Sequence, residues 1–392
     1  MKKIAFAIEN FSRFAGGAES YAVSLARTLI DHSWEVHFFG ERWDGEPSGA
    51  IFHRIDIPRF LPGWLKLICF ALKHRRELTR ESFDVILGFG NTIVMNVYQS
   101  HGGVHWLSTE RKLYTCRSPI VRGLKKLLTR LSFKHWTRHW IESSPFRQDP
   151  RPKVIAISGM IQDDMSACFH IGRDKIEVVY NGVDLKQLER ADSEKMRGPL
   201  RQKLGIPDGH VVFLFVSYDL RKKGVEPLVE AAGILKKSGE SNFSVIVVGG
   251  RPYRSLLKKI EGLGLTDKFF FPGPAKNVDE YYANSDVFVL PTFYDACSLV
   301  VLEAMASGLP AITTETNGAS GVITSGDNGY VISHPPHAGE LAGKMASLLS
   351  TAKRQQMSIS ATQTIQDYSI TRNHQHMLRI FNEVIDRNRS AA

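Results

Sequence analysis

Cysteine is scarce in this chain of 392 residues, and its four cysteines, at positions 69, 116, 168 and 297, stand far apart. The absence of a Cys-x-x-Cys pair or a Cys/His cluster argues against a zinc site or a disulfide framework and predicts a reducing compartment. The chain also lacks a run of about 18 apolar residues that could span a bilayer. Its first apolar run, residues 4–8, is too short for a signal peptide and is typical of a buried strand. We therefore expect a soluble protein or one peripheral to a membrane.

Strand-like and helix-like segments alternate along both halves of the chain. In the first half the expected strands are Lys3–Glu9, Trp34–Phe39, Ile51–Ile57, Asp84–Phe89, Thr92–Tyr98, Val154–Ile157 and Ile176–Val179. After a polar stretch they are Val211–Val216, Ser244–Val248, Phe269–Phe271, Asp286–Leu290 and Pro310–Thr314. Such alternation implies right-handed crossovers and parallel sheets. The sequence thus predicts an α/β protein with two Rossmann-like domains facing a cleft, where ligands bind beyond the carboxyl ends of the strands.

This pattern also predicts where the domains begin and end. The N-terminal domain spans residues 1–184 and carries a basic amphipathic insertion at about 105–140. Residues 185–209 are polar, contain Gly and Pro, and form the expected linker with one short helix. The C-terminal domain spans residues 210–370, and a final helix, 371–392, is expected to pack back on the N-terminal domain.

The first candidate ligand-binding loop contains Gly16 and Gly17, between the first strand and the first helix. Adjacent glycines let the backbone approach an anion, and the start of a helix offers free N–H groups. The pattern is not Gly-x-Gly-x-x-Gly, so a dinucleotide fingerprint is absent. A tight turn with a helix cap would explain these glycines equally well.

The second candidate loop, Asp219–Gly224, directly follows the first strand of the second domain. Arg221 and Lys223 stand where a diphosphate can bind, because Arg grips two oxygens and Lys supplies a point charge. A solvated turn is the alternative interpretation.

The third candidate segment, Pro291–Pro310, carries the strongest signal. Asp295 ends a loop after a strand, and Glu303 lies about two turns into the following helix. The start of that helix lies between them, and its N–H groups can hold phosphate. One acid could therefore bind sugar hydroxyls and the other ribose hydroxyls on either side of a pyrophosphate. Because the neighbours of Glu303 are apolar, its carboxylate needs a partner.

These motifs, together with the turn Asn181–Asp184, resemble retaining nucleotide-sugar glycosyltransferases of family 4, which have the GT-B fold. The resemblance covers essentially the whole chain, with the motifs in the expected order. Within that family, the pattern is most similar to lipopolysaccharide core hexosyltransferases of the glucosyltransferase I type, through Asp219–Gly224, residues 293–295 and Val97–His105. The family usually has a Glu-x7-Glu pair, whereas this sequence has Asp295-x7-Glu303. The shorter acid must approach the sugar more closely or bind it through water.

The resemblance implies roles for individual residues. The expected catalytic residues are His101, Asp295, Lys223 and Arg221. The expected donor-binding residues are Gly16, Gly17, Gly249, Ala275, Ala296, Cys297, Ser298, Leu299, Val300 and Glu303. His101, or His105 as second choice, would meet the donor sugar's 6-hydroxyl. No metal and no cofactor beyond the donor substrate are expected.

The resemblance further implies transfer of a hexose with retention of configuration. The expected donor is a UDP-sugar, first of all UDP-glucose. The expected acceptor is a glycolipid or oligosaccharide, such as the lipopolysaccharide core, bound by the N-terminal domain. Two other functions stay open from the sequence: a GT-B-fold UDP-sugar epimerase and a non-catalytic nucleotide-sugar-binding membrane module. The expected location is the cytoplasm, at the inner face of the cytoplasmic membrane.

Residues 106–140 form a strongly basic window. They hold nine Lys/Arg against one acid, Glu110, and so carry most of the net charge of +10. An apolar stripe at helical spacing and several aromatic residues accompany these cations: Val121, Leu124, Leu128, Leu131, Trp106, Tyr114, Phe133, Trp136 and Trp140. We favour a helix that lies on an anionic membrane surface. An amphipathic core helix and a nucleic-acid surface are the alternatives, and we expect no nucleic acid.

Overall fold

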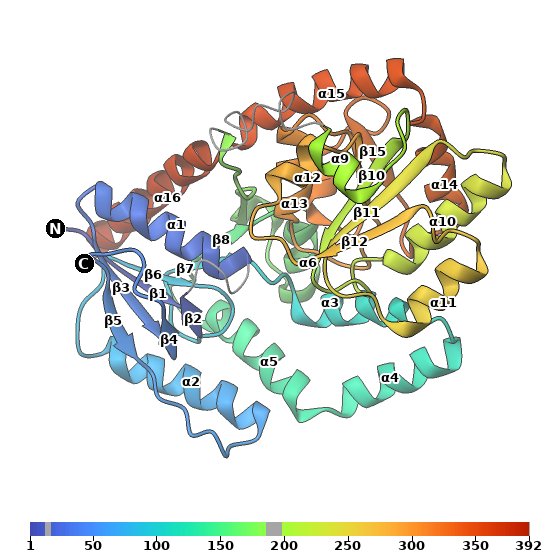
Figure 1. Ribbon diagram of the computed structural model, residues 1–392. Helices are drawn as coiled ribbons and strands as arrows, with labels where there is room; N and C mark the ends of the chain where they lie inside the picture. The colour runs from blue at the N-terminus through green and yellow to red at the C-terminus, as the bar shows by residue number, and fades with distance from the viewer. Residues whose placement is uncertain (12–16, 186–197, 392) are drawn as a thin grey trace. The chain divides into compact units, whose positions relative to one another are not determined.

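The computed structural model describes residues 1–11, 17–185 and 198–391. They form two compact units, which we describe separately. Unit 1 comprises Met1–Tyr180 with Arg372–Ala392, and unit 2 comprises Asn181–Thr371. Each unit is built on its own parallel sheet with flanking helices (Figure 1). The predicted fold class, two α/β domains with parallel sheets, is confirmed.

Unit 1 has a seven-stranded sheet in the order β5-β3-β1-β6-β7-β8-β9, and all neighbours pair in parallel. Its strands are β1 Lys3–Ala7, β3 Glu35–Gly40, β5 Ile51–Arg54, β6 Val85–Gly88, β7 Val97–Ser100, β8 Lys153–Ala156 and β9 Ile176–Val178. Its helices are α1 Gly17–Asp31, α2 Gly63–Leu78, α3 His105–Lys112, α4 Pro119–Leu131, α5 Phe133–Ser143, α6 Gly159–Phe169 and α16 Ile370–Ala391. A separate ribbon pairs β2 Asn10–Phe11 with β4 Arg42–Trp43.

The two faces of this sheet are covered by different helices, because successive side chains of a strand point to opposite faces. Ile4 and Phe6 of β1 belong to a buried cluster with residues of α1 and α16, among them Phe381. Ala5, between them, belongs to a second cluster with Phe70 of α2. The final helix α16 therefore contributes to the core of unit 1, although most of that unit precedes it by some 190 residues of chain.

The expected strand Thr92–Tyr98 begins only at Val97, which corrects the sequence analysis. Asn96, just before this strand, bonds through its side chain to the neighbouring segment. Its amide Oδ1 accepts from the backbone N–H of Ile86 at 2.7 Å, and its Nδ2 donates to the carbonyl of Asp84 at 2.9 Å. Its backbone also bonds to Ile86 and Lys153, so Asn96 marks the start of the pairing, and residues 92–95 form no strand.

Unit 2 has a six-stranded parallel sheet in the order β12-β11-β10-β13-β14-β15. Its strands are β10 Val211–Ser217, β11 Phe243–Gly249, β12 Phe269–Gly273, β13 Val287–Leu290, β14 Ala311–Thr314 and β15 Gly329–Ile332. Its helices are α9 Pro199–Leu204, α10 Val225–Lys237, α11 Arg254–Gly262, α12 Asp279–Ala283, α13 Leu299–Ala306, α14 Ala338–Ser347 and α15 Thr351–Ile365. The central strands β10 and β11 are buried along nearly their whole length, as expected when helices cover both faces of a parallel sheet.

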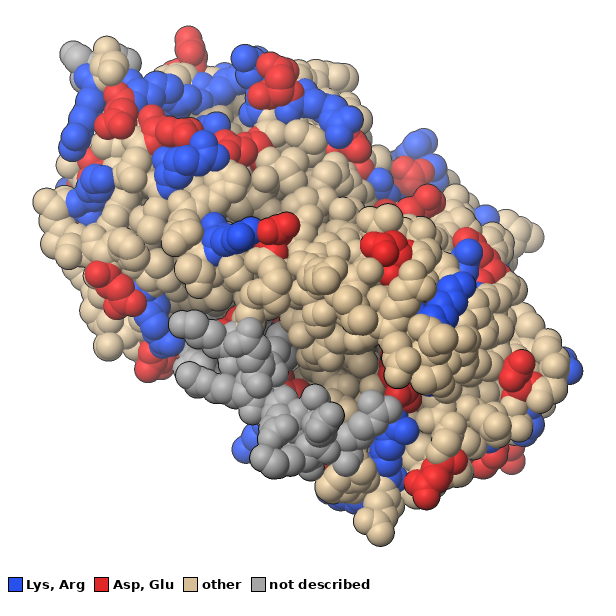
Figure 2. All heavy atoms as spheres, turned by 90° about the horizontal axis from the view of Figure 1, so that it is seen from above, with Lys and Arg blue, Asp and Glu red and all other residues tan. Residues whose placement is uncertain are grey.

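Charges of both signs are mixed over the face of the molecule in Figure 2, where Lys and Arg lie beside Asp and Glu. This agrees with a chain whose positive excess is concentrated in one window of its sequence. Within the described residues, every helix is too short or too polar to cross a bilayer.

The packing of α16 on unit 1 generates a stability prediction. Phe381 is fully buried, so Phe381→Ala should lower the free energy of unfolding by about 3–5 kcal/mol through lost burial and an internal cavity. The same substitution at Phe60, which is 86% exposed, should change it by less than about 0.5 kcal/mol. Urea denaturation of both variants tests this, and an equal effect at the two sites would contradict the packing.

Candidate active site

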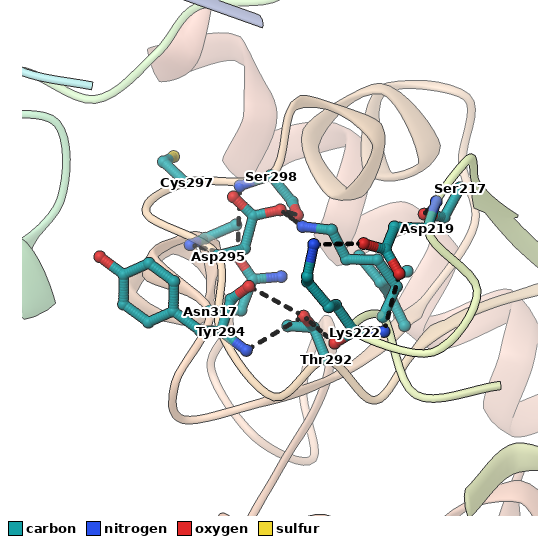
Figure 3. Close-up of polar contacts among 12 residues, drawn as sticks. Ser217, Asp219, Lys222, Thr292, Tyr294, Asp295, Cys297, Ser298 and Asn317 are labelled. Carbon is teal, nitrogen blue, oxygen red and sulfur yellow. Dashed lines mark hydrogen bonds and ion pairs between the residues drawn. The ribbon is translucent and has the colours of Figure 1, made fainter. Parts of the chain in front are cut away.

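The candidate site in unit 2 centres on an ion pair between Lys223 and Asp295. Figure 3 shows Asp295 next to Ser298. Lys223 lies in the loop after β10, and Asp295 lies in the loop after β13. These two strands are neighbours in the sheet, so their carboxyl ends bring the two loops together. The side chains are 24% and 22% exposed, respectively. The pair is therefore shielded from bulk water yet open to a ligand.

Asp295 is held in its charged form by its surroundings. Burial would raise its pKa, but the Lys223 ammonium, the Ser298 hydroxyl and the backbone N–H of Cys297 outweigh burial and hold the pKa below its usual value. Lys223 and Ser298 both bond to the Oδ2 atom of this carboxylate. Near neutral pH, Asp295 therefore accepts hydrogen bonds and does not supply a proton.

The backbone fixes the two loops against each other. The N–H of Phe293 donates to the carbonyl of Lys222 at 3.0 Å, and the hydroxyl of Thr292 donates to the same carbonyl at 3.3 Å. Gly224 has a φ of +84°, and a Cβ there would lie 1.9 Å from the carbonyl oxygen of Pro291. Only glycine fits this close approach, which explains why the cationic loop ends in Lys-Gly.

Asn317 organises the end of the acidic loop, although the sequence analysis did not select it. Its Oδ1 accepts from the backbone N–H groups of Ser298 and Ala319, both at 3.2 Å. The N–H of Gly318 donates to the carbonyl of Asp295 at 2.8 Å. Asn317 is fully buried, just after β14. Its only signal in the sequence is a polar side chain in the loop after the predicted strand 310–314, which does not show which backbone groups it contacts.

Asn181, in the Asn-Gly-Val-Asp turn, approaches the same loop from the start of unit 2. Its Nδ2 donates to the carbonyl of Cys297 at 3.3 Å. Its own Oδ1 is buried and finds no partner among the described residues. Cys297 is buried as well, and burial raises the pKa of its thiol to about 12. Cys297 therefore contributes through its backbone and not as a nucleophile.

Glu303, on α13, has the partner that its apolar surroundings require, and this expectation is confirmed. The hydroxyl of Tyr282, on α12, donates to its Oε2 at 2.8 Å. Burial raises the pKa of Glu303, partly opposed by this hydrogen bond. Tyr282 is only 1% exposed and was not selected from the sequence. From the sequence, nothing about an aromatic residue on a short helix indicates which acid it contacts.

The three cations of the 219–224 loop have three different contacts. Arg221 lies over the ring of Tyr253, with 4.1 Å between guanidinium carbon and ring centroid. Lys222 pairs with Asp219 at 2.6 Å. Lys223 pairs with Asp295. Arg221 and Lys223 therefore contact different residues, although both lie in the same short loop.

The other expected donor-binding residues lie at strand ends and at the start of α13. Gly249 ends β11 with a φ of +112°, and a Cβ there would lie 2.4 Å from the carbonyl oxygen of Ser217. Ala275 is half-buried just after β12, and Ala296 is buried beside Asp295. Leu299 and Val300 begin α13. Gly16 lies outside the described residues, and Gly17 is exposed at the start of α1 in unit 1.

His101 follows β7 in unit 1 and is surrounded by aromatic rings. Its ring lies 4.5 Å from that of Tyr21 and 5.1 Å from that of Phe89, measured between centroids. Burial lowers its pKa to about 3, so the imidazole is neutral. Its buried Nε2 has no partner among the described residues. His105, the second choice, instead bonds to His135 through its Nε2 at 2.7 Å.

Two family models match the chain. Glycosyltransferase Family 4 matches residues 15–187, and Glycosyl transferases group 1 matches residues 196–364. N-acetyl-alpha-D-glucosaminyl L-malate synthase of Bacillus anthracis is 32% identical over 325 residues, which is 81% of this chain and 80% of that relative. The lipopolysaccharide glucosyltransferase WaaG of Escherichia coli (strain K12) is 25% identical over 337 residues, 85% of either chain.

Two solved structures share the fold. The crystal structure of WaaG, a glycosyltransferase involved in lipopolysaccharide biosynthesis, has a TM-score of 0.80 at 21% identity and covers 96% of this chain and 99% of that one. HepE from Anabaena, in complex with UDP-glucose, has a TM-score of 0.68 at 19% identity and covers 98% and 100%. The fold is that of the GT-B glycosyltransferases. The chain belongs to the family 4 and group 1 glycosyltransferases.

The ion pair generates a pH-dependent prediction. Lys223→Met removes the ammonium, so burial acts on Asp295 with less opposition and the pKa of that carboxyl rises. At pH 7 the free energy of unfolding should fall by about 1–3 kcal/mol. In the wild type, the pKa of Asp295 is lower in the folded state than in the unfolded state, where it is about 3.9. This difference stabilises the folded protein above that pH, and the contribution is lost as the pH falls through the folded pKa. The difference between the variant and the wild type should therefore shrink toward pH 3.

Lys222→Met is the matched control for this measurement. Its ion pair with Asp219 is about half exposed on both sides, so its loss should cost less than about 1 kcal/mol. Chemical denaturation from pH 3 to pH 8 measures both variants. A pH-independent effect of Lys223→Met would show that the charge of Asp295 does not depend on Lys223.

Proposed function

We propose that this glycosyltransferase transfers glucose from UDP-glucose, with retention of configuration, to a glycolipid acceptor of the lipopolysaccharide core type. The observation that carries the proposal is the Lys223–Asp295 pair, bonded to Ser298 at the start of α13. A cation, a carboxylate and the N–H end of a helix meet there, and a nucleotide-diphosphate sugar offers a dianionic diphosphate beside neutral hydroxyls. The names of WaaG and the HepE complex support glucose and UDP.

Charge neutralisation is the main demand of this reaction, because the departing diphosphate gains negative charge. Lys223 lies where it can take that charge, and the first N–H groups of α13 have no partner inside their own helix. Preorganised donors of this kind typically lower a barrier by a few kcal/mol each. With these donors present, we propose a donor site without a metal ion and without a further cofactor.

Asp295 has a different part, because it stays ionised and accepts hydrogen bonds. When the diphosphate of the donor draws Lys223 away, the carboxylate becomes available to the hydroxyls of the sugar. The departure from Glu to Asp shortens this arm by one methylene. Ser298 and the N–H of Cys297 then fix where its oxygens lie. Glu303, fixed by Tyr282, is assigned to the ribose hydroxyls.

His101 and Arg221 complete the proposal. The neutral imidazole of His101 has a nitrogen without a partner among the described residues, and we assign it to the 6-hydroxyl of the donor. Arg221 is exposed and rests on Tyr253, from which it can reach a phosphate oxygen. The same face of the sugar receives the acceptor hydroxyl as the diphosphate leaves, and a diphosphate oxygen takes the proton of that hydroxyl.

The helix α4 supports an acceptor at a membrane surface. Its apolar stripe, Val121, Leu124, Leu128 and Leu131, is 45–69% exposed, and none of its residues is buried. The alternative of an amphipathic core helix is therefore wrong. In Figure 1, α4 lies away from the sheet of its own unit, and α5 is on the side nearer that sheet. Exposed aliphatic and aromatic residues flanked by cations suit an anionic lipid surface, and we propose attachment to the inner face of the cytoplasmic membrane.

Turnover tests the donor site. Lys223→Met and Asp295→Asn should each lower kcat by about 10²–10³-fold, because each removes a charge that the transition state needs. Lys222→Met, in the same loop but paired with Asp219, should stay within about threefold of the wild type. Release of UDP from UDP-glucose with a core glycolipid acceptor measures this, and NMR of the product gives its anomeric configuration.

Two results would contradict the proposed reaction. The first is conversion of UDP-glucose to an epimer in the absence of acceptor, which would identify an epimerase. The second is a product of inverted configuration. A panel of nucleotide sugars in a thermal-shift assay identifies the donor, since a ligand at 100 times its dissociation constant stabilises by about 2.7 kcal/mol.

Liposome binding tests the membrane surface. The double variant Leu124→Glu with Leu128→Glu should abolish pelleting with vesicles that contain anionic lipid, because both apolar anchors are lost and two negative charges are gained. Leu257→Glu, at a leucine of unit 2 that is 46% exposed, should pellet as the wild type does. Equal pelleting of the double variant and the wild type would exclude α4 as the membrane contact.

A further inference from the structure

Three potential metal ligands gather in unit 1, on residues that the donor site does not use. His37 lies on β3, His53 lies on the edge strand β5, and Glu81 lies in the connection from α2 to β6. One ligand atom from each residue lies within 4.8 Å of the other two. Over the described ranges of the chain, no other group of three His, Cys, Asp or Glu residues meets this criterion.

Strand pairing holds the two imidazoles on one face of the sheet. His53 is paired with Phe39 in the parallel register of β3 and β5, and His37 lies two residues before Phe39 on the same face. The ring of His53 stacks on that of Phe39 at 4.4 Å and on that of His37 at 5.0 Å, between centroids. His37 is only 2% exposed, and Phe83 packs against its ring. Both rings are thus fixed by the fold.

The distances between the ligand atoms suit one small ion. His37 Nδ1 lies 2.8 Å from His53 Nε2 and 3.8 Å from Glu81 Oε2. Around a tetrahedral zinc ion with bonds of about 2.0 Å, neighbouring ligand atoms are about 3.3 Å apart. The two observed distances lie on either side of this value. Each differs from it by about 0.5 Å, and the third pair, His53 and Glu81, lies within 4.8 Å.

The hydrogen bonds behind His37 set its tautomer. Its other ring nitrogen, Nε2, lies 2.8 Å from Glu35 Oε1, and the same oxygen lies 2.7 Å from the Lys3 ammonium. Paired with the Lys3 ammonium, the Glu35 carboxylate accepts a hydrogen bond from Nε2 of His37. The lone pair of His37 is consequently on Nδ1, which faces His53 and Glu81. A carboxylate behind a ligating histidine is the usual outer support of a zinc site.

Glu81 is 42% exposed on its side chain, which leaves a route for an ion to enter from solvent.

We propose that His37, His53 and Glu81 bind one divalent transition-metal ion of the zinc type, with water as the fourth ligand. Two imidazoles and one carboxylate form a donor set that suits zinc better than magnesium or calcium. The ion would join the edge strand β5 to β3 and to the connection after α2. Its role would therefore be structural, because it fixes the edge strand β5, which otherwise pairs only with β3.

Zinc titration of the full chain, after dialysis against a chelator, tests this site. We expect one equivalent of Zn²⁺ to bind, a rise in the thermal midpoint on binding, and a tetrahedral visible spectrum when Co²⁺ replaces Zn²⁺. Glu81→Gln and His53→Gln should each weaken binding by at least about tenfold. Glu35→Gln should weaken it by about 10–100-fold, although Glu35 does not touch the ion.

His135→Gln is the matched control, because His105 and His135 also face each other, with 2.7 Å between ring nitrogens, but no third potential ligand joins them within the described part of the chain. This variant should bind zinc as the wild type does. Glu81 is on the surface, so Glu81→Gln should fold normally and keeps the test valid if His53→Gln unfolds. No stoichiometric binding, or equal zinc affinity of Glu81→Gln and the wild type, would overturn the site and leave a hydrogen-bonded histidine pair.

Discussion

The ion pair between Lys223 and Asp295 is the interaction on which the proposed donor site depends. A carboxylate in a sheltered place normally gains a proton, but the ammonium and the Ser298 hydroxyl keep this one ionised. The pair also joins two loops that leave neighbouring parallel strands. The close approach at Gly224 allows this contact, because any side chain there would strike the backbone of Pro291. The backbone geometry at Gly224 thus allows the ion pair that keeps Asp295 charged.

Much of this site could be predicted from the sequence, because parallel sheets place chemistry at the carboxyl ends of their strands. Lys223 and Asp295 both follow apolar runs directly, and this position identified them before any contact was known. Glu303 was recognisable as an acid that needs a partner among apolar neighbours. The sequence could not name that partner, since Tyr282 is brought to it only by the packing of α12 against α13. The same holds for Asn317, which bonds to backbone N–H groups.

Other features depend on contacts that no local pattern encodes. The register of β3 and β5 brings His37 to His53, and the connection after α2 adds Glu81, so the sequence spacing shows no metal motif. The strand predicted from Thr92 begins only at Val97, just after Asn96, whose side chain bonds to the backbone of Ile86. The α4 helix shows the opposite case. Its periodicity was visible in the sequence, but only the structure shows that its apolar stripe is exposed and not part of the core.

Calorimetric titration of UDP and of UDP-glucose into the wild type and into Asp295→Asn tests the central claim most directly. If Asp295 binds the sugar and Lys223 binds the diphosphate, the variant should bind UDP at least as tightly as the wild type, because Lys223 no longer has to leave an ion pair. It should also lose the additional affinity that the glucose moiety gives the wild type. If the variant binds both ligands as the wild type does, Asp295 does not contact the donor sugar, and the assignment of the site is wrong.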